Sequence, residues 1–409
     1  MAAESKKSNI DLWGPDNQLT GRIKRVKWLD WSFIKSGIDM PFLIILLIIV
    51  AIGLVSLYSA SYAYAYYFED NSYHYITRQL IFAGLGIFAL IGASFIPYHN
   101  LKKPWVLFIA FFGSLALLVY VLFTHPESGI RRWIGLGIVS FQPSEVAKFA
   151  LILVFAHLMS INHKRMKTFK YGVLPYVLIM GVMCVLVLAE PHLSGTILIG
   201  LIGYMMMVVG GTQKRWLFVI ALLAVAAVAA VLLAGYERDR LLVWNDPVGV
   251  FESNELLPNG QTGRDAAWQT VQSLYAIGSG GFMGQGLGNS RQKHLFLPEP
   301  QNDFIFSIVC EELGFVGALV IIILFALLVW RGFVIGMRAK DKFGSLLAIG
   351  LTAQIGLQVM LNLMVVTNLM PNTGISLPFF SYGGTSLVML LAQMGVVLSV
   401  SRYTNKEEL

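Results

Sequence analysis

Charged side chains at the ends of long apolar stretches are the residues of this sequence best suited to chemistry. Asp303 follows a Pro-Glu-Pro segment and directly precedes the apolar run 304–309. A carboxylate there could act as a general base, or it could simply complement the dipole at a helix N-terminus. Ser307 and Glu311 follow one and two helical turns later, so they share roughly the face of Asp303. This spacing predicts a polar stripe along that helix.

A lysine and a second carboxylate open another apolar stretch. Ser144 is a favourable N-cap residue, and Glu145 suits the first turn of a helix. Lys148 stands three residues after Glu145, so the two side chains lie on the same helix face. Two interpretations stay open. The pair could stabilise the helix end, or Lys148 could be a cation held beside an anionic group of a substrate.

Other motifs are weaker indications of chemistry. The glycine-rich run 278–288 lacks the Gly-Lys-Ser/Thr ending and the preceding strand of a phosphate-binding loop, so we expect a flexible loop. His192 stands alone in a turn, and no cluster of His, Cys and acidic residues has zinc-like spacing. Cys184 and Cys310 both lie in apolar stretches, which favours small core residues over a disulfide.

The elements that must position these residues are membrane helices. The chain of 409 residues is 56% hydrophobic and only 13% charged, whereas a soluble domain carries roughly 25% charged residues. Its apolar blocks of about 17 to 25 residues can cross a hydrocarbon core, and backbone in lipid must be helical. We therefore predict an all-α polytopic membrane protein with about ten transmembrane helices. The predicted spans are 41–63, 79–96, 105–123, 145–160, 173–189, 194–210, 216–234, 303–330, 343–368 and 382–401.

The distribution of lysine and arginine predicts which side of the membrane each loop faces. With both termini cytoplasmic, 21 of the 30 basic residues fall in cytoplasmic segments, eight fall in outer loops, and Lys148 lies within a span. This excess follows the positive-inside rule, so the net charge of +7 is not a sign of nucleic-acid binding. The charge distribution and the spans together predict three segments. They are a cytoplasmic tail (1–40), a ten-span domain (41–403) with a large outer loop (235–302), and a second cytoplasmic tail (404–409).

Five short motifs follow one another along the chain in an order typical of one protein family. They are Arg132-Trp133-Ile134, Phe141 to Glu145 with Lys148, Glu190-Pro191, Leu297 to Phe306 with Glu311 to Gly314, and Thr373-Gly374 with Leu377 to Ser386. Together they resemble the shape, elongation, division and sporulation (SEDS) family, which includes FtsW, RodA and SpoVE. The resemblance covers residues 40 to 403. The run from Ser290 to Lys293 resembles the FtsW/SpoVE branch more than RodA.

The resemblance implies a ten-span peptidoglycan glycosyltransferase of the bacterial cytoplasmic membrane. Such proteins polymerise lipid II on the outer face and work with a class B penicillin-binding protein and other division proteins. The essential aspartate of the family matches Asp303, and its buried lysine matches Lys148. The family's paired arginine and tryptophan match Arg132 and Trp133, and its Ser-Tyr-Gly-Gly element begins at Ser381. His192, Gln301 and Asn302 depart from the family pattern, so no role is carried over to them.

The implied reaction transfers a polyprenyl-pyrophosphate-linked glycan to the 4-hydroxyl group of lipid II with inversion. Asp303 is the predicted general base. Glu145 would orient Lys148, and Trp133 would pack on a sugar or on lipid. The predicted cations for the pyrophosphate are Arg132, Lys148, Arg291 and Lys293. The remaining predicted substrate-binding residues are Gln142, Glu190 and Ser381. A divalent cation, Mg²⁺ or Mn²⁺, could replace part of the role of the basic side chains, although no ligand set is visible.

Two other functions stay open at this point. A lipid II flippase would use the same polar stripe as a pathway, since charges inside a membrane also mark transport routes. Such a transporter should contain an internal repeat, and no convincing repeat is found in the sequence. A non-catalytic scaffold that recruits a transpeptidase is the third alternative, and it would not need Asp303.

Overall fold

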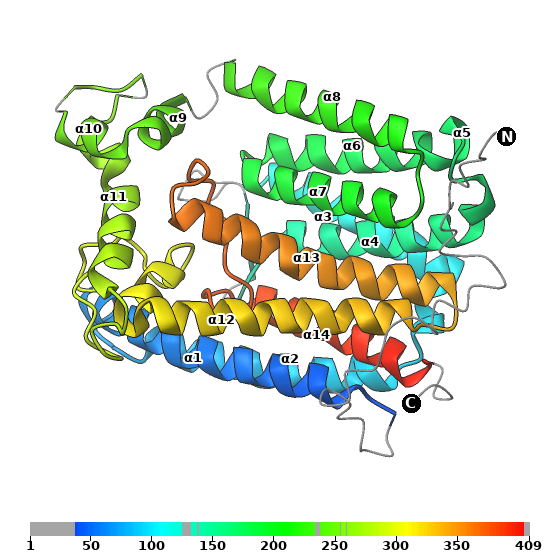
Figure 1. Cartoon of the computed structure of the whole chain (residues 1–409), viewed down its shortest axis with the longest axis horizontal. Coiled ribbons are helices and arrows are strands. Elements are labelled where there is room, and N and C mark those ends of the chain that lie inside the picture. The colour runs from blue at the N-terminus through cyan, green and yellow to red at the C-terminus, as the bar shows by residue number, and fades with distance from the viewer. Residues whose placement is uncertain are drawn as a thin grey trace, which may run out of the picture.

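The structure is a bundle of long apolar helices that run along one axis (Figure 1). This computed structural model describes residues 37–124, 132–136, 139–233, 238–253, 255–258 and 260–404. Within these ranges, eight helices are long and apolar enough to cross a membrane. They are α1 (Met40–Glu69), α2 (His74–Phe95), α3 (Pro104–Leu122), α4 (Pro143–Asn162), α6 (Leu174–Ala189), α12 (Ile305–Met337), α13 (Lys342–Val366) and α14 (Gly384–Arg402). The spans of α4 and α6 include the short helices that adjoin them, and they cover Pro143–Arg165 and Phe169–Ala189.

Two further helices complete the set predicted from the sequence. The helix α7 (Leu193–Val209) has 17 residues, and α8 (Lys214–Leu233) has 20 residues. Each of the ten predicted spans therefore coincides with a helix, and the all-α prediction is confirmed. Short elements lie between the long helices: η3 (Tyr98–Lys102), η4 (His163–Arg165) and α5 (Phe169–Gly172). The predicted tails, 1–40 and 404–409, lie almost entirely outside the described residues.

The centre of the bundle is formed by α13, α14 and α4. In the span of α13, 72% of the residues are buried, against 67% in α14, 61% in α4 and only 17% in α3. The helix α13 packs against α4, α7, α12 and α14, and α14 packs against α2. A helix that is apolar on all sides belongs in such a core. The polar residues that interrupt these central helices therefore face protein and not lipid.

The large loop predicted at 235–302 is partly a helical cap. It contains α9 (Arg238–Asn245), α10 (Pro247–Glu252) and α11 (Gly263–Gly280). These three helices, called the cap here, surround a small core of Val243, Ala267 and Val271. Figure 1 shows α11 running across the end of the bundle, nearly perpendicular to the long helices.

The glycine-rich run is not the flexible loop that we expected, because it is bonded to a kink in α12. Gly314, inside α12, has a φ of 66°, so the regular helical hydrogen bonds cannot form there. The N–H groups of Gln285 and Gly286 bond to the carbonyls of Glu311 and Glu312 at 3.0 and 2.9 Å. A Cβ on Gly284 would lie 2.2 Å from a carbonyl oxygen of α12. Glycine is needed there because the two backbones are in direct contact.

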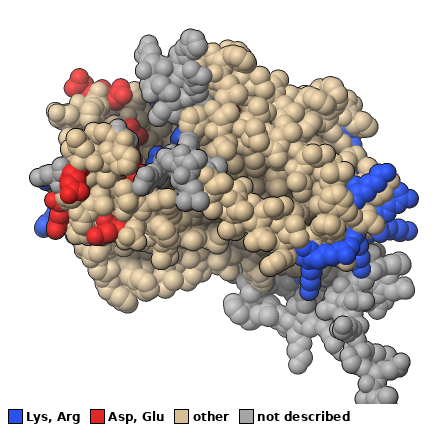
Figure 2. All heavy atoms as spheres, turned by 90° about the horizontal axis from the view of Figure 1, so that it is seen from above, with Lys and Arg blue, Asp and Glu red and all other residues tan. Residues whose placement is uncertain are grey.

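Charged residues segregate between the two ends of the bundle. Figure 2 shows lysine and arginine gathered at the end opposite the cap, whereas most of the visible acidic residues lie at the cap end. This arrangement agrees with the loop charges counted in the sequence.

Candidate active site

A cavity of about 550 Å³ opens at the cap end of the bundle, where α4, α7, α12 and α14 begin. Seven of the ten predicted site residues line it. They are Arg132, Trp133, Gln142, Glu145, Lys148, Asp303 and Ser381. The motifs that are scattered over 250 positions of the sequence are thus brought together in one place.

Asp303 is fixed just before the first turn of α12. Asn362 of α13 donates its side-chain N–H to the Asp303 carbonyl at 2.8 Å. The Ser381 hydroxyl donates to the neighbouring Asn302 carbonyl at 2.7 Å. Gly374 faces the carboxylate, and a Cβ there would lie 3.0 Å from Oδ2. The carboxylate is therefore held by its backbone, which leaves its oxygens directed toward the cavity.

The environment of Asp303 favours a carboxyl group that exchanges a proton near neutral pH. Burial, and then the charge of Glu299, raise the pKa of Asp303 to about 6. Arg132 and Arg240 act in the opposite direction and limit the rise. At pH 7 the carboxylate form predominates and can accept a proton, which is the property that a general base needs.

Lys148 forms a buried ion pair at the wall of the cavity. Its Nζ lies 2.7 Å from Glu145 Oε1 and 3.5 Å from the amide oxygen of Gln358. Gln358 in turn donates its N–H to the Ser376 carbonyl at 3.1 Å. Glu145 Oε2 has no hydrogen-bond partner among the described residues. The pair therefore stabilises the start of α4, and it also presents polar groups to the cavity.

A short hairpin positions the arginine and tryptophan motif. The strands β1 (Ile134–Leu136) and β2 (Val139–Phe141) pair antiparallel, with Ile134 opposite Phe141. The residues just outside this pair, Trp133 and Gln142, are thereby brought to the same edge of the cavity. Trp133 keeps 40% of its surface exposed, so its ring is available for a ligand. Arg132 donates a hydrogen bond to the carbonyl oxygen of Pro191.

Glu190 stands behind the cavity and not on its surface. It is fully buried, and neither carboxyl oxygen has a hydrogen-bond partner among the described residues. Burial raises the pKa of Glu190 to about 8, although Arg132 opposes the rise. At neutral pH the uncharged form is favoured, so direct substrate binding is not supported for Glu190. Its neighbour His192 does line the cavity, and burial lowers the pKa of His192 to about 3, which keeps the ring neutral.

Three helix N-termini point at the same cavity. Residues of the first turns of α4, α7 and α14 all line it. None of the three N-cap residues, Gln142, His192 and Gly383, caps its helix with a side-chain hydrogen bond. The free N–H groups of a helix N-terminus carry partial positive charge and bind anions. Together with Arg132 and Lys148 they make the cavity suited to an anionic ligand.

The structure does not support Arg291 and Lys293 as cations for a substrate. Lys293 is fully buried, and its Nζ lies 2.8 Å from Glu312 Oε1 and 2.6 Å from the Gly288 carbonyl. Arg291 is exposed, and neither residue lines the cavity. The sequence suggested otherwise because both residues precede Asp303 closely, but the chain turns between them.

The polar residues predicted to follow Asp303 along α12 do not line the cavity. Ser307 shares a hydrogen bond of 2.7 Å with Ser273 of α11. Glu311 accepts from the Ser290 hydroxyl at 2.5 Å and from the Arg291 backbone N–H at 2.9 Å. These groups hold the cap and the glycine-rich run in place. They do not continue the surface that contains Asp303.

Several residues that line the cavity were not singled out from the sequence, and three of them have polar side chains that bear on its chemistry. Arg78, just before the second predicted span, was counted only as an outer-loop charge. Ser194 gave no signal, since one serine after a turn is common. Gln358 gave a recognisable signal, because a glutamine in the middle of an apolar span needs a polar partner.

The described side chains do not form a metal site. No group of three or more His, Cys, Asp or Glu residues within the described ranges is placed to hold a metal ion. Of the two acids that line the cavity, Glu145 is engaged by Lys148 and only Asp303 is not ion-paired.

Comparisons with known proteins agree over almost the whole chain. The profile of the FtsW/RodA/SpoVE family, described as cell cycle protein, matches residues 39–406. Stage V sporulation protein E of Bacillus subtilis is 40% identical over 377 residues, which cover 90% of this chain and 98% of the relative. A probable peptidoglycan glycosyltransferase FtsW of Geobacter sp. is 36% identical and covers 89% of this chain and 97% of its own.

Solved structures share the fold. A chain from a peptidoglycan synthase complex that coordinates polymerization and crosslinking superposes with a TM-score of 0.72 at 28% identity, covering 90% of this chain and 99% of its own. The rod shape determining protein RodA of Thermus thermophilus gives a TM-score of 0.64 at 27% identity and covers 93% of this chain and 100% of its own. The chain thus belongs to the FtsW/RodA/SpoVE family of multi-pass membrane proteins.

Proposed function

We propose that this protein is a peptidoglycan glycosyltransferase that polymerises lipid II into glycan strands. The observation that carries the proposal is the cavity in which one carboxylate, Asp303, which has no ion-pair partner in the described part of the chain, lies among three basic side chains and three helix N-termini. Relatives named probable peptidoglycan glycosyltransferase FtsW support the same activity. A glycosyl transfer that releases a pyrophosphate needs both a base and a cationic site, and the cavity contains groups of both kinds.

The reaction makes one bond and breaks one. The 4-hydroxyl oxygen of lipid II attacks the anomeric carbon of the growing glycan and transfers its proton to Asp303. The bond from that carbon to the pyrophosphate breaks, and the polyprenyl pyrophosphate leaves with the electron pair. Since attack and departure occur on opposite faces, the anomeric centre is inverted. The carboxylate form of Asp303 is available because its pKa of about 6 lies below neutral pH.

The leaving group is the part of the substrate that needs most stabilisation. Lys148 and Arg132 are the basic side chains that we assign to the pyrophosphate, with Glu145 orienting Lys148 at 2.7 Å. The N-termini of α4, α7 and α14 add backbone N–H donors. Trp133 and Gln142 at the rim are assigned to the sugar or lipid. A divalent cation would need ligands from the pyrophosphate itself, and no step is assigned to it.

The charge pattern supports a location in the bacterial cytoplasmic membrane with the cap and the cavity outside and both termini in the cytoplasm. The likeness to a peptidoglycan synthase complex supports a class B penicillin-binding protein as partner. The stage V sporulation relative and the FtsW relatives support a role in division or in sporulation septum synthesis, alongside other division proteins.

A single assay separates this proposal from its rivals. Purified protein in detergent is given labelled lipid II, and the polymer is resolved by gel. Wild type should make polymer, and Asp303→Asn should be slower by roughly 100- to 10,000-fold. A flippase would make no polymer in detergent, because detergent provides no membrane across which a lipid could be moved. A non-catalytic scaffold would also make no polymer, and its Asp303→Asn variant would still form the complex with a transpeptidase. Full polymerisation by Asp303→Asn contradicts the assignment of the base.

A further inference from the structure

The cap is bonded to the segment that connects α13 with α14. From α9, Arg240 Nη1 donates a hydrogen bond to the Asn372 carbonyl at 2.9 Å. Trp244 Nε1 donates to the Asn368 carbonyl at 3.1 Å, and the Asn368 side chain donates back to the Trp244 carbonyl at 3.2 Å. One short helix of the cap thus holds the segment 367–374 at two points.

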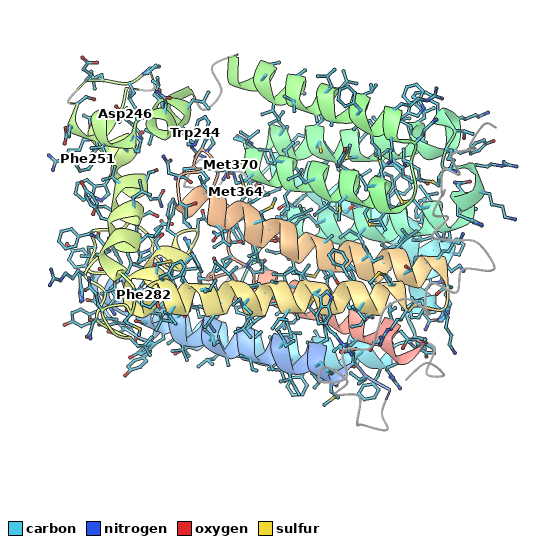
Figure 3. The ribbon with its side chains drawn as sticks, viewed as in Figure 1. Trp244, Asp246, Phe251, Phe282, Met364 and Met370 are labelled. Atoms are coloured by element: carbon cyan, nitrogen blue, oxygen red, sulfur yellow. The ribbon has the colours of Figure 1, made fainter. Side chains whose placement is uncertain are left out.

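A second helix of the cap reinforces this junction. The Asn372 side-chain N–H donates to Gln269 Oε1 of α11 at 3.0 Å. Figure 3 shows Trp244 on α9, and Met364 and Met370 at the end of α13, where the cap meets the bundle. Asn372 is therefore fixed through its backbone by α9 and through its side chain by α11.

The fixed segment leads directly to the carboxylate of Asp303. Gly374 donates its N–H to Asn372 Oδ1 at 3.3 Å, and its Cα faces Asp303 so closely that a Cβ would lie 3.0 Å from Oδ2. The side-chain N–H group of Asn362 bonds both the Ile375 carbonyl, at 2.7 Å, and the Asp303 carbonyl, at 2.8 Å. A displacement of Asn372 would therefore move the wall against which the carboxylate rests.

Arg240 also acts on Asp303 through its charge. Burial and Glu299 raise the pKa of Asp303, and two arginines oppose the rise, first Arg132 and then Arg240. The remaining charged or titratable groups around the cavity are Arg78 on α2, Glu145 and Lys148 on α4, His192 before α7, and Tyr382 before α14. Arg240 is the contribution of the cap to this set.

We propose that Arg240 is a positioning residue for Asp303, acting from the cap through the Asn372–Gly374 segment. Its guanidinium holds the segment against the carboxylate and favours the ionised form. The inference rests on the proposed function, because it takes Asp303 as the group that accepts the proton. It adds that a residue of the outer cap contributes to the pH range in which the enzyme works.

The test is the pH profile of lipid II polymerisation by purified full-length protein. Arg240→Ala should move the acid limb of the pH profile upward by about one pH unit, so that the rate near pH 6 falls roughly fivefold and the rate above pH 8 falls less than about threefold. Arg240→Gln keeps a donor for the Asn372 carbonyl but loses the charge, and it should shift the limb in the same direction. Lipid II affinity should not change in either variant.

Arg264 provides the matched control, since it lies in the same cap and stacks over Phe251, with its Cζ 5.4 Å from the ring centre. Arg264→Ala removes the same charge from the cap and should leave the acid limb at its wild-type position. The inference is overturned if Arg240→Gln keeps the wild-type limb, or if Arg264→Ala shifts it equally. A wild-type protein that makes no polymer at any pH would instead contradict the proposed function.

Discussion

Two buried lysine–glutamate pairs lie toward the cap end of the bundle. They differ in whether their charged groups keep an oxygen without a hydrogen-bond partner. In the first, Lys148 and Glu145 are 2.7 Å apart on one helix, both line the cavity, and Glu145 Oε2 has no hydrogen-bond partner among the described residues. In the second, Lys293 and Glu312 are 2.8 Å apart, and neither residue lines the cavity.

The charged groups of the second pair are fully hydrogen-bonded within the protein. The ammonium group of Lys293 is also bonded to the Ser59 hydroxyl and to the Gly288 carbonyl. Both oxygens of Glu312 accept from Ser59, at 2.6 and 2.7 Å. A buried charge whose bonds are all made within the protein has nothing left for a ligand, whereas the incompletely bonded pair at the cavity can bind one. The Lys293–Glu312 pair, called the closed pair here, is thus structural. The Lys148–Glu145 pair, called the open pair, is available for chemistry.

The largest expected effect comes from breaking the closed pair. Lys293→Met leaves Glu312 charged and buried without a counterion, which should cost about 3–5 kcal/mol of unfolding free energy. Denaturant unfolding in detergent measures the loss. The double variant Lys293→Met/Glu312→Gln removes the uncompensated charge and should recover much of the stability. An unchanged unfolding midpoint for Lys293→Met would show that this pair is not structural.

Breaking the open pair should affect the rate more than the fold. Lys148→Met removes a cation from the developing negative charge, so polymerisation should slow by about 100- to 1,000-fold, while lipid II still binds. Steady-state assays measure the rate. The companion variant Lys148→Met/Glu145→Gln removes the charge left on Glu145, and it should fold like wild type yet stay slow. A rate within about threefold of wild type in both variants would argue against the role of Lys148.

The third prediction concerns pH. Asp303 must be deprotonated to accept a proton, and its pKa is about 6. The rate should therefore be nearly constant above that pH and should fall about tenfold for each unit below it. The pH dependence of kcat/KM measures this limb. A rate that stays constant down to pH 4.5 would exclude a base with a raised pKa.

The smallest expected effect is at the N-terminus of α7. Ser194 lines the cavity, is only 2% exposed, and its hydroxyl has no hydrogen-bond partner among the described residues. Ser194→Ala should weaken lipid II binding by about threefold to tenfold, the effect of one lost hydrogen bond. Ser160→Ala is the control, because that hydroxyl bonds the carbonyl of its own helix at 2.7 Å. Equal affinities in both variants would remove Ser194 from the site.

The helices and the principal site residues could be predicted because both depend on local sequence. Apolar blocks of membrane length specify spans wherever they occur, and all ten coincide with helices. Asp303 and Lys148 stand beside recognisable motifs at the starts of α12 and α4. Position in a motif was sufficient to predict that both residues line the cavity.

The closed pair could not be predicted, because its partners are remote in sequence. Ser59 is 234 positions before Lys293, and the glycine-rich run reaches α12 only because the helix is kinked at Gly314. The hydrogen bond from Arg240 to Asn372 could not be predicted either, because the two residues are 132 positions apart. Periodicity along one helix placed Glu311 beneath Asp303, but contacts from other segments decide which polar groups reach the cavity.

The most direct test of the account compares three variants, Asp303→Asn, Lys148→Met and Lys293→Met, in one lipid II polymerisation assay normalised to the folded fraction. We predict that the first two stay folded and lose polymer, whereas the third is less stable but polymerises normally per folded molecule. Normal polymerisation by Asp303→Asn, with loss of activity in folded Lys293→Met, would place the chemistry away from the cavity and contradict the account.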